Sequence, residues 1–387
     1  MKKILLKLYN IIPPRIREIV LQFLNYLNIA KYADKCQYIN KNYEEDYYSK
    51  TRWGKYNEER KHWYKNYKKI LNVTNEREQI YNFYNDKMEI VRQGEFEKGK
   101  VILICLVKND LVRIKELIKH YKNIGVYNFA IIDNNSTDGT FEFLLSQPGF
   151  YIFSIKEKYS TMRRQAWINR VISYFGLNKW YIIVDSDEFL CYNGMDLKDI
   201  DNLVDYCVKK KIKRMKSLMV DMYPKTFLME NGHDELFMKK FKYFDVSGYK
   251  IDKNKFFLNV IGGMRSRLFK VSPYLVKMPL IYIDKKTIQY NSHYSFPFYC
   301  NYQKEINLAL LHYKFLPSDF DKITDAIKNE NFASGSKEYK KYFEIYNNDK
   351  NACLISDESE IYNNTDDIYK IKVLSKIEWE SNNDKKK

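Results

Sequence analysis

Apolar and polar residues follow a regular order over the middle of the chain, and this order predicts a layered α/β domain. Continuous apolar runs at residues 101–107, 128–133, 150–155 and 180–185 are typical of strands that are buried on both faces. Between these runs, apolar residues recur every three or four positions until a Gly or Pro, as expected for helices. We therefore expect a mostly parallel central sheet with helices on both faces.

The pattern is looser in the rest of the chain. A helix is expected near residues 197–210, a strand at 213–220 that ends at Asp221, and helices over 300–346. The expected parts are a helical N-terminal extension (1–98), the α/β domain (99–315), and a helical C-terminal region with a solvated tail (316–387).

The N-terminal extension contains one amphipathic helix, expected at residues 16–27. Its apolar face either packs on the α/β domain or lies in a membrane interface, and both alternatives stay open. No segment reaches the roughly 20 apolar residues of a transmembrane helix, and no cleavage site follows the apolar run at 4–12. We expect a cytoplasmic protein, with peripheral attachment to the inner face of the cytoplasmic membrane as the alternative.

Composition adds a strong positive charge to this picture. The net charge of +17 attracts polyanions such as nucleic acid, anionic lipid or a phosphorylated substrate. It is spread along the chain with no nucleic-acid-binding motif, so we expect no nucleic-acid partner; an anionic membrane surface and compositional drift remain alternatives. The six cysteines form no CxxC pair, which favours a reducing compartment.

Acidic residues stand where three of the expected strands end. Asp110 follows the first strand, Asp133 closes the second and Asp185 closes the fourth. In an open parallel sheet, ligands bind outside the carboxyl ends of the strands, so these side chains should face one crevice. For Asp110 there is a simpler alternative, because it could only cap the helix that follows.

The segment VDSDEF at residues 184–189 carries the strongest chemical signal in the chain. Asp185 and Asp187 are two residues apart at the end of a buried strand, and carboxylates so placed repel one another unless a cation joins them. Mg²⁺ or Mn²⁺ held by one or two carboxylates and by substrate phosphates is the usual arrangement. The loop at 133–140, which includes Asn135, would present polar groups and helix N-terminal amides to the same ligand.

Several segments resemble, in order and spacing, the motifs of glycosyltransferase family 2-like enzymes. They are CLVKND (105–110), IIDNNSTDGT (131–140), Arg163-Arg164-Gln165, VDSDEF (184–189), GGMRSRLF (262–269) and KMPL (277–280). The nearest branch is related to families 2 and 92 in bacterial capsule or lipopolysaccharide clusters. The resemblance implies a GT-A fold, a nucleotide-sugar donor, a glycan or lipid-linked acceptor, and inverting transfer of a hexose-type sugar.

The resemblance also implies roles for individual residues. Asp133 would contact the base or ribose, Asp185 and Asp187 would serve the ribose and the metal-bound diphosphate, and Arg164 would lie beside the phosphates. The first loop departs from the common family form, because Val107-Lys108-Asn109 stands where Pro and Tyr-Asn are usual.

The remaining candidates are open between a chemical and a structural role. His293 and His312 are two of only five histidines, and GT-A enzymes often add a late His to the metal site. An inverting enzyme also needs a carboxylate base, for which Asp221, Asp234 and Glu235 are the candidates.

Arg265, together with Arg267, either binds phosphate or lies in a solvated turn. Two rival functions remain for the whole chain. One is a catalytically inactive GT-A scaffold at the membrane surface, and the other is a phosphatase of the haloacid-dehalogenase type, whose DxD motif belongs on the first strand.

Overall fold

The structure is a computed structural model, and it describes most of the chain after residue 85. The described residues are 86–96, 99–227, 237–252, 259–284, 287–289, 292–293, 295–296, 305–316, 319, 337–349 and 351–379. The amphipathic helix expected at 16–27 lies outside them, as do Asp234 and Glu235. None of the helices in these ranges combines the length and the apolar character that crossing a membrane requires.

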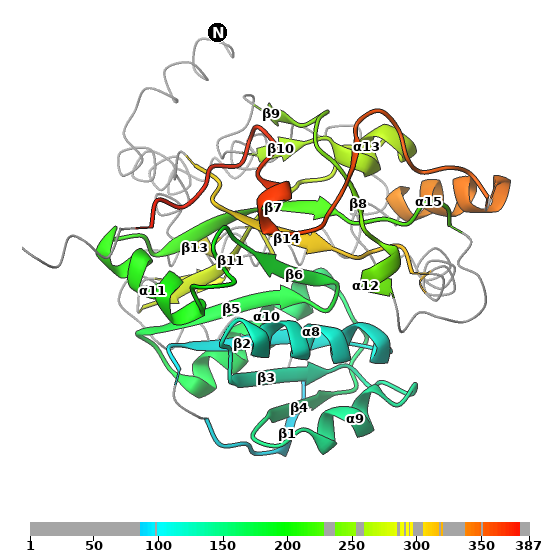
Figure 1. Cartoon of the computed structure of the whole chain (residues 1–387). Coiled ribbons are helices and arrows are strands. Elements are labelled where there is room, and N and C mark those ends of the chain that lie inside the picture. The colour runs from blue at the N-terminus through cyan, green and yellow to red at the C-terminus, as the bar shows by residue number, and fades with distance from the viewer. Residues whose placement is uncertain are drawn as a thin grey trace, which may run out of the picture.

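A nine-stranded sheet forms the centre of the molecule (Figure 1). In spatial order its strands are β1 (Met88–Arg92), β4 (Tyr151–Ile155), β3 (Asn128–Asp133), β2 (Val101–Val107), β5 (Lys179–Asp185), β11 (Val276–Ile283), β7 (Arg214–Asp221), β14 (Leu308–His312) and β6 (Glu188–Cys191). Strands β2 to β5 are parallel, and β11 is antiparallel to both β5 and β7. Because β14 is parallel to β7, the strands β5, β7 and β14 all run in the same direction.

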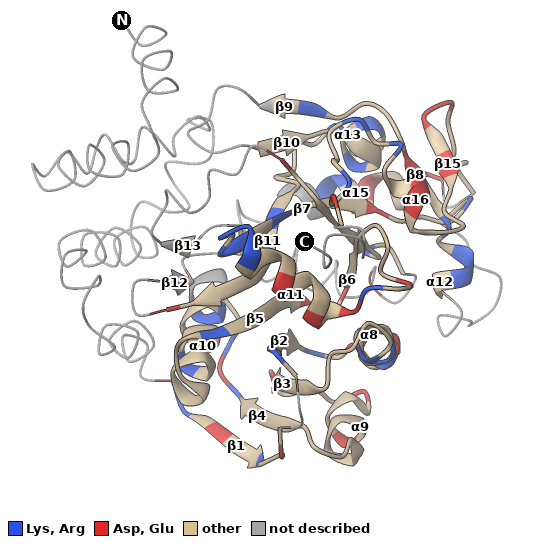
Figure 2. Cartoon of the chain, turned by 60° about the vertical axis from the view of Figure 1, so that its left-hand side comes forward, with Lys and Arg blue, Asp and Glu red and all other residues tan. Residues whose placement is uncertain are grey.

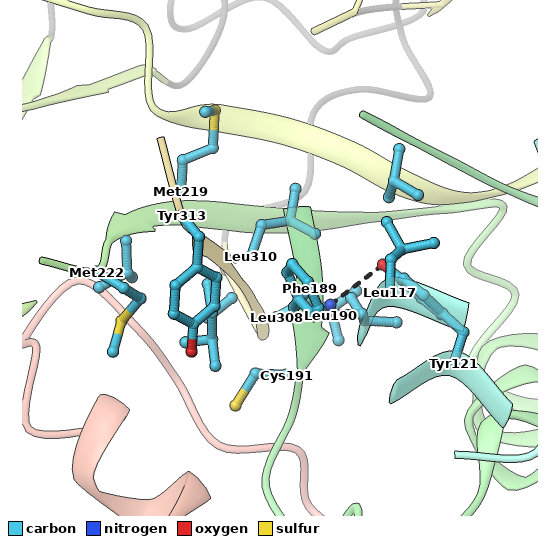
Figure 3. Packing of buried hydrophobic residues seen from close by; sticks show 14 of the residues in the cluster. Leu117, Tyr121, Phe189, Leu190, Cys191, Met219, Met222, Leu308, Leu310 and Tyr313 are labelled. Atoms are coloured by element: carbon cyan, nitrogen blue, oxygen red, sulfur yellow. Dashed lines mark hydrogen bonds between the residues drawn. The ribbon is translucent and has the colours of Figure 1, made fainter. Parts of the chain in front are cut away.

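Helices cover both faces of this sheet, as the sequence predicted. They are α8 (Leu111–Asn123), α9 (Thr140–Ser146), α10 (Thr161–Phe175) and α11 (Ile200–Lys209). Successive residues of a strand point to opposite faces, and β2 shows the result. Leu103 belongs to the same core cluster as Leu117 of α8, whereas Ile104 belongs to the cluster of Trp167 in α10. The first cluster continues from α8 to β6, β7 and β14 (Figure 3). The predicted α/β fold, with a mostly parallel sheet between helices, is confirmed.

Smaller elements surround the second half of the sheet. They are α12 (Phe237–Lys240), β8 (Tyr243–Asp245), β9 (Lys250–Asp252), β10 (Asn259–Ile261), α13 (Gly263–Phe269), β12 (Ile288–Gln289), β13 (Ser295–Phe296), α15 (Lys337–Asn348), β15 (Ser359–Ile361) and α16 (Thr365–Ile368). Strands β9 and β10, β12 and β13, and β8 and β15 form two-stranded sheets. Helix α13 contacts β7, β8 and α15, so it lies against the same end of the large sheet.

The sheet curls between β5 and β6. Only Ser186 and Asp187 separate these strands along the chain, whereas β11, β7 and β14 lie between them in the pairing order. Three residue steps span at most about 11 Å, but four strand spacings of a flat sheet measure about 19 Å. The sheet therefore bends until β6 returns towards the end of β5. This bend gathers the ends of β5, β7 and β14 around the turn between β5 and β6.

Two sequence predictions for the C-terminal part of the chain do not hold in the described ranges. Residues 308–312 were expected to be helical but form strand β14, between β7 and β6. A five-residue apolar run does not distinguish a helix from a strand by periodicity, and the neighbouring strands decide it. The expected solvated tail instead packs on the domain up to Trp379, because Ile371 and Ile377 are buried in its core.

The N-terminal boundary also differs from the expected one. Residues 88–92, assigned from the sequence to the helical extension, form β1 and pair with β4 at the edge of the sheet. The α/β domain thus begins before residue 99.

Charged residues of both signs are distributed over the described elements. Figure 2 shows basic residues on β9, α12 and α13 and acidic residues on α11, β8 and β15. The described surface therefore does not concentrate the positive charge on a single element.

Candidate functional site

Two of the predicted acidic residues lie on either side of β2 at the carboxyl edge of the sheet. In the parallel ladders, Asp133 is the partner of Val107 and Asp185 is the partner of Leu106. One strand therefore separates the two aspartates, and their backbones lie about 10 Å apart. The edge at which the sequence predicted a crevice therefore has Asp133 at the end of β3 and Asp185 at the end of β5.

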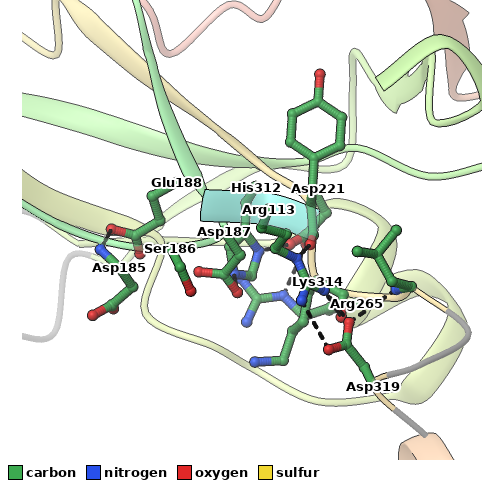
Figure 4. A network of polar contacts seen from close by, with 12 residues as sticks. Arg113, Asp185, Ser186, Asp187, Glu188, Asp221, Arg265, His312, Lys314 and Asp319 are labelled. Atoms are coloured by element: carbon green, nitrogen blue, oxygen red, sulfur yellow. Dashed lines mark hydrogen bonds and ion pairs between the residues drawn. The ribbon is translucent and has the colours of Figure 1, made fainter. Parts of the chain in front are cut away.

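The curl of the sheet brings a carboxylate and an imidazole together beside this edge. His312, at the end of β14, is the register partner of both Asp221 in β7 and Glu188 in β6. Asp187, Glu188 and His312 each offer one ligand atom, and these atoms all lie within 4.8 Å of one another (Figure 4). Carboxylate oxygens and imidazole nitrogen suit Mn²⁺ or a similar divalent ion, so the residues fit such a cation.

Hydrogen bonds fix the imidazole of this group from both sides. The Nε2 atom of His312 lies 3.2 Å from Oδ2 of Asp187, and its Nδ1 atom lies 2.7 Å from Oδ1 of Asp221. Burial alone would raise the pKa of Asp187, but the neighbouring His312 outweighs it and holds that pKa well below its usual range. Burial lowers the pKa of His312, whereas the two carboxylates more than offset this and raise it. Asp187 is thus an ionised ligand candidate.

Asp185 faces protein cations instead. Its Oδ1 atom accepts hydrogen bonds from Nε (3.1 Å) and Nη2 (2.6 Å) of Arg164, and its Oδ2 atom accepts one from Nζ of Lys277 at 2.9 Å. Burial would raise the pKa of Asp185, but Arg164 and then Lys277 hold it well below its usual range. Both oxygens of this carboxylate therefore already have positive partners.

Lys277 ties Asp185 to Glu188. Its side chain is buried, and its ammonium also donates to Oε1 of Glu188. The other oxygen of Glu188 accepts from the backbone N–H of Asp185 at 3.2 Å. Burial, aided by Asp185 and Asp187, raises the pKa of Glu188, and only Lys277 and His312 oppose it. Of the three clustered residues, Asp187 and His312 are therefore the better placed to bind a cation.

Asp110 joins the site rather than capping its helix. It occupies the N-cap position of α8, but its side chain makes no capping hydrogen bond. One carboxylate oxygen accepts from the Ser186 hydroxyl and the other from Nη1 of Arg113 at 2.9 Å. Arg113 also donates to the Tyr313 carbonyl at 2.7 Å and forms an ion pair with Asp319. This network holds the turn after β5 and the segment after β14 against the start of α8.

Asp133 has a buried oxygen without a hydrogen-bond partner. Its Oδ2 atom accepts from the backbone N–H of Ser136 at 3.0 Å, whereas no hydrogen-bond donor among the described residues reaches Oδ1. Burial raises the pKa of this carboxyl group. Asn135 is exposed and left-handed (φ 58°), while its buried neighbour Asn134 donates to the Ile155 carbonyl at 2.9 Å. An unpaired buried acceptor is unusual, and a ligand donor would satisfy it.

Residues of helix α10 present further unpaired polar atoms. Nη1 of Arg164 and both side-chain polar atoms of Gln165 are buried and have no hydrogen-bond partner in the part of the chain that the structure describes. Because Arg164 is bonded to Asp185 through its other nitrogens, the remaining donor is held in a fixed direction. These atoms, like Oδ1 of Asp133, are suited to a polar ligand.

The two arginines of helix α13 are both engaged with aspartates. Nε of Arg265 donates to Oδ2 of Asp221 at 2.8 Å, and Nε of Arg267 donates to Oδ2 of Asp245 at 3.0 Å. Arg265 is 4% exposed, so it does not lie in a solvated turn. Its predicted contact with phosphate stays a prediction.

His293 lies outside the three-residue group. Its Nδ1 atom is hydrogen-bonded to the Val276 carbonyl at 2.8 Å. Burial, followed by the charge of Lys277, lowers its pKa to about 4. Within the described residues, His312 is the histidine that meets the carboxylates.

Sequence reasoning gave no role to Lys277, although it begins the KMPL motif, and did not name Arg113. Both could have been recognised in the sequence, because each is a charged residue among apolar ones. Lys277 is the only charged residue of the strand VKMPLIYI, and Arg113 precedes Leu117 by one helical turn on the buried face of α8. A charge so placed needs a buried partner of opposite sign.

Comparisons with known proteins give only distant likenesses. No family model matches the chain, and no curated protein sequence matches it. Among solved structures, the mannosyltransferase PcManGT from Pyrobaculum calidifontis in complex with GDP-Man and Mn²⁺ is 14% identical, with a TM-score of 0.26 over 39% of this chain and 46% of that one. S. aureus TarS 1-349 is 16% identical, with a TM-score of 0.23 over 35% and 37%. The chain thus spans less than half of each, and neither likeness carries an inference about activity.

Proposed function

We propose that this chain is a glycosyltransferase that uses a nucleotide-sugar donor and a divalent cation, Mn²⁺ or Mg²⁺. The observation that carries the proposal is the convergence of Asp187 and His312 at the carboxyl edge of the sheet, with their facing atoms 3.2 Å apart. Oδ1 of Asp133 and Nη1 of Arg164 offer an acceptor and a donor at the same edge, and neither buried atom has a partner within the described ranges. A site of this kind suits a ligand with a sugar or base at one end and phosphates at the other.

Each group has a distinct task in such a transfer. Asp187 and His312 would hold the cation, whose positive charge neutralises the departing diphosphate. Arg164 adds a donor beside the phosphates, and Asp133 would accept from the base or ribose. Lys277 keeps Asp185 and Glu188 charge-paired, so these carboxylates do not repel the diphosphate.

The acceptor in this proposal is a glycan or a lipid-linked saccharide of cell-surface polysaccharide synthesis, and the transfer inverts the anomeric configuration. Inversion requires a base at the acceptor hydroxyl. Asp234 and Glu235 stay candidates for that base and lie outside the described residues.

The rival functions fit the described site less well. A phosphatase with a DxD nucleophile needs that motif on its first strand, whereas Asp185 ends β5, after four other described strands. An inactive scaffold would have no need of an acidic and imidazole pair beside unpaired polar atoms, since such atoms are costly to bury.

The test is a screen of nucleotide-sugar donors with the full chain, with and without Mn²⁺. We expect one donor to be hydrolysed slowly in the absence of acceptor, and only when the cation is present. The matching nucleoside diphosphate should raise the melting temperature together with Mn²⁺ more than either one alone.

Two variants control this screen. Asp187→Asn should abolish both effects, whereas Asp245→Asn, which also removes a buried charge paired with an α13 arginine, should retain them. If no donor is hydrolysed and no nucleoside diphosphate with Mn²⁺ shifts the melting temperature, the proposed function is wrong and the chain is an inactive scaffold.

Membrane attachment is a separate part of the proposal. The amphipathic segment at 16–27, with Arg15 and Arg17 opposite its apolar positions, would bind an anionic membrane surface from the cytoplasmic side. Flotation with anionic and neutral liposomes should show the full chain rising with the anionic ones, and a chain without residues 1–30 remaining at the bottom. Equal flotation of both chains would show that this segment does not attach the chain to the membrane.

A further inference from the structure

Four side chains form a continuous line from helix α13 to the turn after β5. Arg265 donates to Oδ2 of Asp221 at 2.8 Å, and Oδ1 of Asp221 lies 2.7 Å from Nδ1 of His312. On the other side of the ring, Nε2 of His312 lies 3.2 Å from Asp187. Figure 4 shows these four residues gathered beside one another, with Asp187 to the left and Asp221 to the right of His312.

In this arrangement Asp221 is poorly placed to act as the base that takes a proton from the hydroxyl of the acceptor molecule. Both of its oxygens are engaged by Arg265 and His312, and the residue is 3% exposed. A base must receive a proton from a hydroxyl that reaches it, and here neither oxygen faces outward.

The same contacts suit Asp221 to control which ring nitrogen of His312 is protonated. A carboxylate only accepts hydrogen bonds, so the nitrogen that faces it carries the proton. Without a cation, Nε2 also faces a carboxylate, that of Asp187, and by the same argument carries a proton. A cation bound between Asp187 and His312 would take the place of that proton, while Asp221 keeps the proton on Nδ1. Ligating histidines are commonly fixed in this way by a carboxylate on the far ring nitrogen.

We propose that Asp221 is a positioning residue, which orients His312 and keeps a proton on Nδ1, so that Nε2 is the nitrogen that binds the cation shared with Asp187. The inference rests on the proposed function, because it assumes a divalent cation at Asp187 and His312. Arg265 supports it by fixing the second oxygen of Asp221, so that the carboxylate does not rotate.

The geometry predicts an unusual consequence for Asp221→Asn. The amide has an oxygen that accepts hydrogen bonds and an NH₂ group that donates them. Because Nε of Arg265 is a donor, the oxygen turns towards Arg265. The NH₂ group then faces Nδ1 of His312 and donates to it, which moves the ring proton to Nε2. The lone pair needed for the cation is lost although the shape of the side chain is unchanged.

The experiment measures binding of Mn²⁺ alone to the full chain, from the free-ion signal in electron paramagnetic resonance. We expect Asp221→Asn to weaken binding by about 10- to 100-fold. The matched control is Asp245→Asn, because Asp245 is also buried and paired with an arginine of α13 but bonds to Tyr223 rather than to His312. The control should bind Mn²⁺ as the wild type does.

A rescue variant separates positioning from a general loss of structure. In the double variant Asp221→Asn with Arg265→Met, the amide no longer has to face an arginine and can turn its oxygen to Nδ1. We expect Mn²⁺ binding to recover about tenfold relative to Asp221→Asn alone. A merely structural role for the pair predicts that the double variant binds no better than the single one.

A second measurement does not depend on the variants folding. In the Mg²⁺-loaded wild type with nitrogen-15-labelled histidine, long-range proton–nitrogen spectra should show His312 protonated at Nδ1 and not at Nε2. The chain has only five histidines, and the His312→Gln spectrum identifies the signal.

The outcomes distinguish this inference from the proposed function. A wild type that binds no Mn²⁺, alone or with a nucleoside diphosphate, overturns the proposed cation site. A wild type that binds Mn²⁺ while Asp221→Asn binds equally well overturns only the positioning role. Lost turnover with unchanged Mn²⁺ affinity in Asp221→Asn would assign Asp221 as the base instead.

Discussion

The two aspartates of the turn between β5 and β6 stand two residues apart, yet they have different partners. Asp185 binds Arg164 through one oxygen and Lys277 through the other. Asp187 faces Nε2 of His312. The first carboxylate is neutralised by cations that the protein carries itself, whereas the second is paired with an imidazole, which binds metal ions in its neutral form.

This difference shows that a pair of aspartates in a DxD triplet does not by itself make two metal ligands. The strand direction decides which partner each side chain meets. β11 is antiparallel and begins at this edge, so its Lys277 comes beside Asp185. β14 is parallel and ends there, so its His312 comes beside Asp187. We refer to these as the Asp185 side and the Asp187 side.

The largest expected effect is on the Asp187 side. Asp187→Ala should lower sugar transfer by about 1,000-fold, because loss of the cation removes several kcal/mol of charge stabilisation. Thermal unfolding without metal should change little, since Asp187 lies partly at the surface. Turnover at saturating Mn²⁺ is the measurement, and a loss below tenfold would mean that the cation is held elsewhere.

On the Asp185 side, the larger effect should be on stability. Lys277→Met leaves Asp185 and the buried Glu188 without their shared cation, and we expect about 3 kcal/mol less free energy of unfolding. Urea unfolding measures this, with Lys277→Arg as the charge-preserving control. Equal stability of the Met variant and the wild type would show that the ion pairs do not hold the Asp185 side together.

Acid unfolding tests the carboxylate behind His312. The pKa of Asp221 is lowered to about 2 in the folded chain, so its ionised form stabilises the fold. This stability is present above the unfolded pKa of about 4 and is lost as the pH falls through about 2, a loss of about 2 kcal/mol. Between pH 5 and pH 2, Asp221→Asn should therefore lose about 2 kcal/mol less than the wild type. Parallel pH profiles would contradict the lowered pKa.

The smallest expected effect concerns the unpaired nitrogen of Arg164. Arg164→Lys keeps a positive charge near Asp185 but removes the donor Nη1. Affinity for a nucleoside diphosphate with Mn²⁺ should fall about tenfold, in line with one lost hydrogen bond to a charged group. Titration calorimetry gives this value. An unchanged affinity would mean that Nη1 does not reach the ligand.

Much of the first half of the sheet could be predicted from the residues alone. The runs at 101–107 and 128–133 form β2 and β3 with the expected bounds, and α10 is one of the helices expected between the runs. Strands buried on both faces must be apolar throughout, so their limits show in the sequence. For the same reason, the acidic residues that follow them could be placed at one edge of the sheet.

The second half could not be predicted equally well, because its neighbours are distant in the chain. The run LALLH at 308–312 was expected to be helical, and its strand form depends on β7 and β6 on either side. The partners of Asp185 come from residues 21 and 92 positions away. No local pattern encodes such pairings.

The sequence by itself determined the α/β class of this chain, the carboxyl-edge position of Asp133 and Asp185, and His312 as a histidine that could join them. Only the tertiary structure decided that Asp187, and not Asp185, meets this histidine. It also decided that Asp221 lies behind the ring. The physical reason is that apolar periodicity is a local property of the chain, whereas the charge environment of a carboxylate depends on strands that the curled sheet brings together from remote positions.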